Sequence, residues 1–263
     1  MTRPSLRAPA SVAGVALVAA LGVYGAAASP LFSVSRVTVS GAGAEVGDRL
    51  VARLRWGQGR NVLDVQQREI DRAVAMEPRI ASARLVRHLP SVLEVRVIPR
   101  GPVAYVATGQ SIVEVDKQGR VLGPPPAGTS RELPVITGAW QPGAVPEPLE
   151  PAPQAVALGA ELADRLLPLL GGRLSELHLD AERGEWRLLL TDGSSVEWGV
   201  AGDGQGSALS PDDLRRLTLL SALLQRLGPG DMPFQADMRN GDRVTWSRAT
   251  SHGPAPAKDA SGL

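Results

Sequence analysis

Cysteine is absent from the 263 residues of this chain, and histidine occurs only three times. Without cysteine, the protein can form no disulfide framework, thiolate zinc site, iron–sulfur cluster or cysteine nucleophile. His88, His178 and His252 are far apart, and none has a second histidine three or four residues away, so no histidine-based metal signature is present. The sequence also contains no Gly-x-Ser-x-Gly nucleophile elbow and no Walker phosphate loop. These absences argue against an enzyme and predict no metal, cofactor or small-molecule substrate.

Positive and negative side chains nearly balance, with a net charge of +1, and this argues against a nucleic-acid binder. Hydrophobic residues make up 43% of the chain, which is enough for a core and excludes a wholly disordered protein. The charge is uneven, because residues 33–101 carry 12 basic and 7 acidic side chains, whereas residues 102–263 carry 14 and 20. This asymmetry predicts two domains with different neighbours, although uneven surface charge without functional meaning is the other interpretation.

The N-terminal segment is the longest uncharged stretch, with 28 residues between Arg7 and Arg36. A helix over residues 9–29 would be long enough to cross a hydrocarbon core of about 30 Å. Two arginines and no acidic residue precede it, so residues 1–8 are predicted to be a cytoplasmic tail and the rest to be exported. Ala26-Ala27-Ala28 offers a possible cleavage site for a signal peptide, but the length of the uncharged stretch favours an uncleaved anchor.

The region after this segment predicts the element order β-α-α-β-β. Alternating side chains over residues 33–40 indicate a strand, and apolar residues four apart over residues 45–55 indicate a helix. A second helix is expected to begin at Asp64, with Gln67 three residues later in capping-box spacing. Two further strands are expected at residues 80–87 and 93–98, joined by the tight connection 88–91.

The remainder predicts a mixed α+β domain. Helices are expected over residues 155–170 and from Ser210, where a serine cap precedes Pro211 and two acids. That last helix is expected to turn four leucines inward, namely Leu214, Leu217, Leu220 and Leu224. Strands are expected at residues 113–122 with a central turn, 174–180, 185–191, 194–198, 232–239 and 242–248, with Trp186 and Trp198 in the core. The glycine-rich segment 202–206 is interpreted as a loop and residues 249–263 as a disordered tail.

Two segments resemble the FtsQ/DivIB family of cell-division proteins in the first region. Residues 32–41 (FSVSRVTVSG) look like the opening strand of a POTRA domain. Residues 78–104 (PRIASARLVRHLPSVLEVRVIPRGPVA) resemble the end of that domain, with its Pro-x-Ile, Leu-Pro, Leu-x-Val-x-Val and closing Pro-Val-Ala. Pro99-Arg100-Gly101 stands where the family usually has Glu-Arg before Pro-Val-Ala, which is a mild departure.

The second region resembles the same family at two places. Residues 133–138 (LPVITG) are similar to the family's Leu-Pro-x-x-x-Gly segment, and residues 237–241 (DMRNG) are similar to Asp-Leu-Arg-Tyr…Gly near its C-terminal end. Asn240 replaces the usual aromatic residue, which puts part of any partner contact in doubt. The resemblance implies an α+β fold with a transmembrane helix, a POTRA domain at 32–101 and a domain with a curved, antiparallel-rich sheet at 102–248.

The resemblance further implies a bitopic scaffold of the inner membrane, with its C-terminus in the periplasm, that links division proteins at the septum. POTRA-like domains bind extended peptides by adding a strand to a sheet edge, so we expect one such surface in the basic first region and one at the terminal strand 242–248. The resemblance implies that the terminal strand receives FtsB of the FtsB–FtsL pair. The expected partner-binding residues are Arg239, Asn240, Gly241, Arg243, Val244 and Trp246.

Within this set, Val244 and Trp246 would contact the partner while Arg239 and Arg243 pair with its acids. Packing of Val244 and Trp246 into the protein's own core is the alternative. The arginines of the first region, Arg53, Arg55, Arg84 and Arg87, are interpreted as a solvated face. Two other functions stay open: a POTRA-containing component of a protein export or outer-membrane assembly machine, and a periplasmic wall-modifying enzyme. The first usually carries several POTRA repeats, and only one is found here.

Overall fold

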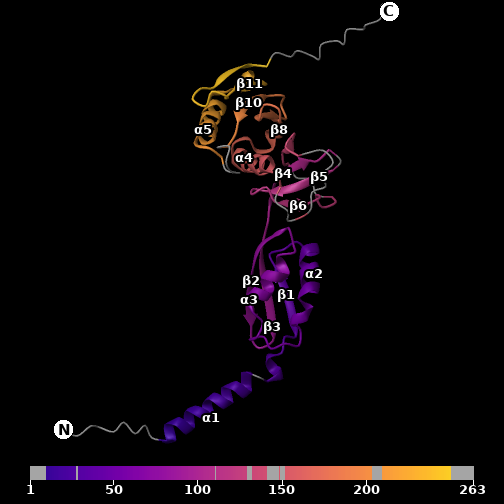
Figure 1. The fold of residues 1–263 in the computed structure, drawn as a ribbon, viewed down its shortest axis with the longest axis vertical. Helices are drawn as coiled ribbons and strands as arrows, with labels where there is room; N and C mark the ends of the chain where they lie inside the picture. Colours follow the sequence, from indigo (N-terminus) through magenta and orange to yellow (C-terminus); the bar gives the residue numbers. More distant parts are fainter. Residues whose placement is uncertain are drawn as a thin grey trace, which may run out of the picture. The chain divides into compact units, whose positions relative to one another are not determined.

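The computed structural model describes residues 10–27, 29–109, 111–128, 132–140, 148, 152–202 and 209–249. The chain divides into two compact units, Met1–Arg100 and Gly101–Leu263, and each has its own hydrophobic core. Figure 1 shows the elements of both units. The expected cytoplasmic tail, most of the glycine-rich loop and nearly all of the expected disordered tail lie outside the described residues.

The first helix, α1, covers Ala10–Ala27 and is followed by the short 3-10 helix η1 at Pro30–Phe32. It lies within the segment for which the sequence predicts a helix. Within the described part of the chain, no helix has both the length and the hydrophobicity that crossing a membrane requires.

From Arg36 onward, the first unit is a three-stranded sheet with two α-helices, and the order β-α-α-β-β of this part confirms the prediction from sequence (Figure 1). The strands lie in the order β1-β3-β2, with β1 parallel and β2 antiparallel to the central strand β3. Alternate apolar side chains such as Val37 and Val95 point into the core that the helices cover. The elements are β1 (Arg36–Ser40), α2 (Ala44–Arg53), η2 (Leu54–Gly57), α3 (Gln67–Val74), β2 (Ile80–His88) and β3 (Val92–Pro99).

The predicted start of α3 is wrong by three residues. The helix begins at Gln67, after Gln66, whose backbone N–H donates to the Glu69 carboxylate at 2.9 Å. The residues before it form a turn instead of helix: the N–H of Asp64 donates to the carbonyl of Asn61 at 3.1 Å, and Val62 and Val65 on either side are fully buried in the core. As a result Gln67 is not a capping residue, and its side chain is free to reach the sheet.

The second unit contains a nine-stranded sheet in the order β12-β11-β10-β9-β8-β7-β4-β5-β6. Five neighbouring pairs are antiparallel and three are parallel (β4–β7, β7–β8 and β10–β11), which confirms a mixed, antiparallel-rich α+β domain. The sequence analysis did not assign β4 and β7. The strands are β4 (Pro102–Ala107), β5 (Ile112–Asp116), β6 (Val121–Gly123), β7 (Val135–Thr137), β8 (Leu174–Asp180), β9 (Glu185–Leu190), β10 (Ser195–Val200), β11 (Phe234–Asp237) and β12 (Thr245–Arg248).

Two helices accompany this sheet, α4 (Gln154–Leu170) and α5 (Pro211–Arg226), with short 3-10 turns at Gly171–Arg173 and Pro229–Asp231. Trp186 and Trp198 are buried between sheet and helices, as the sequence predicted. The predicted inner face of α5 needs correction, because Leu214 is 49% exposed and Leu223 is buried instead. The helix turns Asp213 inward, and this rotates Leu214 towards solvent.

The last two strands are shorter than the sequence predicted. Residues 238–244 leave the ladder to form the connection between them, because the backbone turns at Asn240-Gly241. Gly241 has a positive φ of 64°, and its N–H donates to the carbonyl of Met238 at 3.1 Å. The prediction that the final strand lies at a sheet edge is confirmed by the strand order.

Candidate functional site

The edge strand β12 is a short segment whose four residues, Thr245–Arg248, are all exposed. It pairs antiparallel with β11, and Ala249 continues the register by donating its N–H to the carbonyl of Pro233 at 2.8 Å. Hydrogen-bonded pairs recur every second residue of an antiparallel ladder, so Ser247 also faces β11. The N–H and C=O groups of Trp246 and Arg248 therefore point to the open side of the sheet.

Trp246 and Val244 have different surroundings. Trp246 lies opposite the buried Ala236 and is therefore on the helix side of the sheet, yet it is 43% exposed because no strand lies beyond it. Val244 is half-buried and packs against the core of the second unit. Of the two side chains expected to face a partner, Trp246 is the more accessible.

In the connection, Arg239, Asn240, Asp242 and Arg243 are exposed, whereas Met238 and Gly241 are buried and Val244 is half-buried. Arg239 already has an acidic neighbour in its own chain, because its Nη2 lies 2.6 Å from Oδ2 of Asp237. Hydrogen bonds from Arg239 hold the pKa of Asp237 below its ordinary value. An acid on a partner would therefore have to share Arg239 with Asp237, whereas Asn240 and Arg243 are both exposed.

A shallow hollow of about 550 Å³ lies beside β12, on the face of the sheet that the helices do not cover. Small side chains on its floor, such as Ser195, Thr245 and Ser247, leave this space. Glu197 and Asp237 are cross-strand neighbours there. The hollow can receive side chains from any strand that joins the sheet beside β12.

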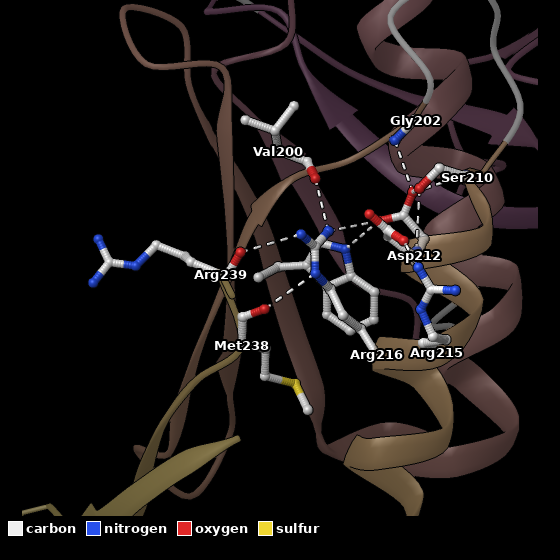
Figure 2. A network of polar contacts seen from close by, with 10 residues as sticks. Val200, Gly202, Ser210, Asp212, Arg215, Arg216, Met238 and Arg239 are labelled. Atoms are coloured by element: carbon white, nitrogen blue, oxygen red, sulfur yellow. Dashed lines mark hydrogen bonds and ion pairs between the residues drawn. The ribbon is translucent and has the colours of Figure 1, made fainter. Parts of the chain in front are cut away.

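The connection to β12 is held by a buried ion pair that the sequence analysis did not find (Figure 2). The carboxylate of Asp213 is completely shielded from solvent. Its Oδ1 accepts hydrogen bonds from Trp198 Nε1 at 2.9 Å and Arg216 Nη1 at 3.0 Å. Its Oδ2 accepts from the N–H of Gly202 at 2.8 Å and from the N–H and hydroxyl of Ser210 at 2.9 and 2.7 Å.

The pKa of Asp213 follows from these contacts. Burial alone would raise the pKa, but the hydrogen bonds from Ser210, Gly202 and Trp198 outweigh burial and lower the pKa below its ordinary value. The carboxylate is therefore ionised at neutral pH, and it is the buried counter-charge for Arg216.

Arg216 reaches from α5 to the ends of two strands (Figure 2). Its Nη1 donates to the carbonyl of Val200, at the end of β10, at 2.7 Å. Its Nε donates to the carbonyl of Met238 at 3.1 Å, and its Nη2 to that of Arg239 at 3.4 Å. Because Met238 and Arg239 directly follow β11, Arg216 fixes the start of the connection that leads to β12.

The sequence analysis interpreted Asp212 and Asp213 together as charges at a helix start. This is correct for the cap, since the N–H of Asp213 donates to Ser210 Oγ at 3.2 Å, and for the exposed Asp212, which pairs with Arg215. It missed that Asp213 is also buried. A signal was present in the spacing, because Asp213, Arg216, Leu220 and Leu223 recur every three or four residues and share one helix face.

Two of the histidines lie in the described residues, and both contact acidic side chains. His88 Nε2 lies 2.6 Å from Glu94, whose pKa is lowered to about 2 by hydrogen bonds from Arg96, His88 and Ser40. His178 Nδ1 lies 2.7 Å from the hydroxyl of Thr137 and 3.7 Å from Glu176. Within the described ranges, no group of three or more acidic or histidine side chains is arranged to hold a metal ion.

Comparison with known families gives one family match. The family model for the C-terminal part of cell division protein FtsQ/DivIB matches residues 104–239, which is more than half of the chain. The match covers the second unit from β4 to Arg239 and ends before β12.

Three curated relatives illustrate the similarity, and each is named cell division protein FtsQ. The protein of Mycobacteroides abscessus is 27% identical over 179 residues, covering 65% of this chain and 52% of its own. That of Mycobacterium leprae is 28% identical over 196 residues, covering 72% and 51%. That of Anaeromyxobacter sp. is 29% identical over 202 residues, covering 69% and 61%. The aligned region thus spans about half to three fifths of each relative's length.

A solved structure is also similar: the major extracytoplasmic domain of the trans isomer of the bacterial cell division protein DivIB from Geobacillus stearothermophilus. It is 22% identical and covers 49% of this chain and 97% of that chain, with a TM-score of 0.30.

Proposed function

This chain belongs to the FtsQ/DivIB family of cell division proteins, and we propose that it is a scaffold that gathers other division proteins at the septum and acts by binding them. We propose no catalytic step. The observation that carries this proposal is the open edge of β12, where the backbone groups of Trp246 and Arg248 point away from the sheet.

The proposed topology is that of a bitopic inner-membrane protein. The uncharged segment 9–29 would be the anchor, residues 1–8 the cytoplasmic tail, and residues 32–248 would lie in the periplasm. The long uncharged stretch between Arg7 and Arg36 supports this topology. The β-α-α-β-β order of the first unit supports its assignment as a POTRA domain, with a boundary to the second domain near Gly101.

Partner binding would occur by strand addition. A strand of the partner would pair with the outward backbone groups of β12 and extend the nine-stranded sheet by one. Main-chain hydrogen bonds would give affinity, and side chains on both faces would give specificity: Trp246 on the helix side, and the hollow beside Thr245 and Ser247 on the other.

The expected partner is FtsB, acting with FtsL, by family resemblance. Trp246 would be the main apolar contact, because a large half-exposed aromatic side chain gains most from burial in an interface. Arg243 is exposed and would pair with an acidic side chain of the partner, whereas a partner acid at Arg239 would share that arginine with Asp237. Asn240, Gly241 and the half-buried Val244 would hold the shape of the connection rather than form the centre of the contact.

Proline substitution at β12 tests strand addition directly. Arg248→Pro removes one outward N–H and keeps the ladder to β11, whereas Arg248→Ala keeps that N–H and removes the same ion pair with Asp231. We expect Arg248→Pro to lose photocrosslinking from a probe at Trp246 to FtsB in cells, and Arg248→Ala to retain most of it. Equal crosslinking of the two variants would contradict strand addition.

Localisation tests the scaffold role. A fluorescent protein that matures after export, fused to the C-terminus, should form a band at mid-cell during division. Depletion of the chain should block septum formation. An even envelope signal with normal septa after depletion would contradict the role, whatever the outcome of the crosslinking.

A further inference from the structure

Three loops at one end of the first unit carry exposed leucines. Leu31 lies in η1 and is 72% exposed, Leu63 lies in the loop before α3 and is 44% exposed, and Leu89 lies between β2 and β3 and is 61% exposed. A single exposed leucine is ordinary, but a group of them at one end of a unit indicates contact with another apolar surface. We call these three residues the leucine end.

Backbone hydrogen bonds hold the other two loops against the entry segment, residues 29–35. The N–H of Val62 donates to the carbonyl of Phe32 at 2.8 Å, which brings the loop before α3 beside η1. The N–H of Ser35 donates to the carbonyl of Ser91 at 2.8 Å, which brings the turn between β2 and β3 to the same segment. The leucine end is therefore one surface, and it lies where the chain enters the first unit.

The exposed charge around the leucine end is mainly positive. Arg36 follows the entry segment, Arg55 lies in η2 and Arg87 lies near the end of β2, and all three are exposed. The guanidinium of Arg87 donates to two backbone carbonyls of the loop before α3, at 3.1 and 2.6 Å, which holds its charge at this end. Asp64 is an exposed acid in that loop. The three arginines outnumber this acid, so the end attracts an anionic surface.

An aromatic side chain borders the same end. Trp56 in η2 is 39% exposed, and the guanidinium of Arg60 lies 5.0 Å from the centre of its ring. The backbone carbonyl of Arg60 accepts from the entry segment at 2.8 Å. Arg60 also pairs with Glu69 at 2.9 Å, so it adds little net charge. Tryptophan combines an apolar ring with a polar N–H, and it is enriched where a membrane meets water.

Chain connectivity limits the distance between this end and the anchor. In the proposed topology the anchor ends at residue 29, two residues before Leu31. Two residues span at most about 7 Å. The headgroup layer on each side of the hydrocarbon core is about 5–7 Å thick. The leucine end therefore lies at the membrane surface in that topology, and lipid is the apolar phase nearest to it.

We propose that the leucine end is a membrane-contact surface, which lies on anionic phospholipids next to the anchor. Its three leucines enter the headgroup layer, and Arg36 and Arg55 bind lipid phosphates. Contact at three loops holds the first unit in one orientation on the membrane, whereas an anchor alone leaves the unit free to turn. The proposal rests on the proposed topology, and it does not depend on partner binding at β12.

Quenching of single fluorescent labels by lipid tests this contact. Because the chain has no cysteine, Leu63→Cys and Leu89→Cys each provide one site for the dye NBD, and both positions are exposed, so the core stays intact. The full-length variants are placed in vesicles of phosphatidylcholine and phosphatidylglycerol at about two to one. Phosphatidylcholine brominated near the top of its acyl chains is the quencher. Both labels should lose about half of their fluorescence, as expected for side chains at the boundary of headgroups and acyl chains.

Two further labels are the controls. Ile98→Cys is matched in exposure, since Ile98 is 63% exposed, and it lies about 20 Å along β3 from Val92, towards the other end of the unit. Its label should keep its fluorescence. Leu21→Cys places a label in the proposed anchor, and this label should be quenched.

Charge reversal tests the preference for anionic lipid. Arg36→Glu should reduce the quenching at Leu89, because it places an acid at the lipid phosphates. Arg72→Glu changes the net charge equally at an exposed position near the end of α3, and it should leave the quenching unchanged. Equal quenching in the two variants would overturn the proposed binding of anionic lipid.

The label positions separate failure of this proposal from failure of the topology. Quenching at Leu21 without quenching at Leu63 and Leu89 would overturn the proposal and leave the topology intact. Absence of quenching at Leu21 would overturn the topology and this proposal with it. A blue shift of the Leu89 label without quenching by lipid would place a protein surface at this end and overturn the proposal. The scaffold role is tested separately, by localisation.

Discussion

At the scale of single residues, two kinds of ion pair occur within one turn of α5. Asp212 and Arg215 are both more than half exposed, whereas Asp213 and Arg216 are buried. Exposed pairs contribute little because water screens them, whereas breaking a buried pair leaves an uncompensated charge in the interior. Arg216 also satisfies three backbone carbonyls at the ends of β10 and β11. This residue therefore links helix stability to the position of β12.

Arg216→Ala should lower the free energy of unfolding by about 3–5 kcal/mol, because it leaves Asp213 buried without its counter-charge. Urea denaturation of the second unit measures this. Arg215→Ala is the matched control, and its effect should be at most about 1 kcal/mol. Similar effects of the two substitutions would contradict the structural importance of the buried pair.

The Asp237–Arg239 pair should make stability depend on acid. The pKa of Asp237 lies below its ordinary value of 3.8 in the folded chain, because Arg239 donates hydrogen bonds to it. The resulting stability is fully present above pH 3.8 and is lost as the pH falls through the folded pKa. As the pH falls from 5 to 2, the free energy of unfolding of Asp237→Asn, measured by urea denaturation, should therefore decrease less than that of the parent. Arg239→Ala should likewise show a smaller decrease. A decrease equal to the parent's in both variants would contradict the role of this ion pair.

At the scale of elements, the backbones of two edge strands differ in whether a side chain hydrogen-bonds to them. On β2, the side chain of Gln67 donates to the carbonyl of Ala83 and accepts from the N–H of Leu85. On β12, no side chain in the described part of the chain hydrogen-bonds to the backbone of Trp246 or Arg248, and the strand is only four residues long. Short length limits indiscriminate pairing, and open backbone groups permit a specific one. This difference leaves the backbone of β12 the more accessible of the two edges.

Packing between strands also explains why the segment Leu133–Gly138 ends in glycine. Gly138 follows β7 with a φ of +74°, and a Cβ at this position would overlap the carbonyl oxygen of Leu179 on β8. Gly138→Ala should therefore be destabilised by more than the roughly 1–2 kcal/mol that the left-handed backbone alone costs. Gly184→Ala is the control, because its φ is +68° and its Cβ would meet open space. Thermal or urea unfolding that ranks the two equally would show that the close approach to Leu179 is unimportant.

At the scale of the whole molecule, the described residues form two hydrophobic cores that share no residue. The first contains side chains such as Leu50 and Val95, and the second contains Leu166 and Trp198. Each core closes its own sheet and helices, so each unit has the means to fold by itself. In the proposed scaffold role, separate cores would let each unit keep its own packing when the other binds a partner.

Two matched substitutions test this independence. Leu50→Ala and Leu166→Ala each remove a fully buried leucine side chain, and each should cost about 2–5 kcal/mol. Hydrogen exchange should show loss of protection only in the first unit for Leu50→Ala and only in the second for Leu166→Ala. Loss of protection in both units from either substitution would show that the units unfold as one.

The local elements were predictable because their signals are short-range. The alternation in residues 33–40 and 93–98 and the Ser210-Pro211 helix start depend on neighbours within a few positions. The errors arose where tertiary contacts override local pattern. Val62 and Val65 enter the core and delay the start of α3, and Asp213 turns inward on α5 and brings Leu214 to the surface.

The candidate site was predictable in part. The sequence located the terminal strand and Trp246, since a strand near the chain end often lies at a sheet edge. It left open which way Val244 and Trp246 point, and it did not find Arg216. A side chain's period along a strand does not say which face is buried, and an arginine's buried partners can be known only when the strands that carry them are positioned.

By itself, the sequence determined the order of most helices and strands, the division into two regions of opposite net charge, and the family. Only the tertiary structure decided that β12 is an open edge, that Arg216 holds its connection, and that Gln67 hydrogen-bonds to the edge of β2. The physical reason is the separation along the chain over which each effect acts: hydrophobic periodicity and helix capping depend on residues a few positions apart. Strand order and burial instead depend on contacts between residues that are distant in sequence, such as Gln67 with Leu85 or Arg216 with Met238.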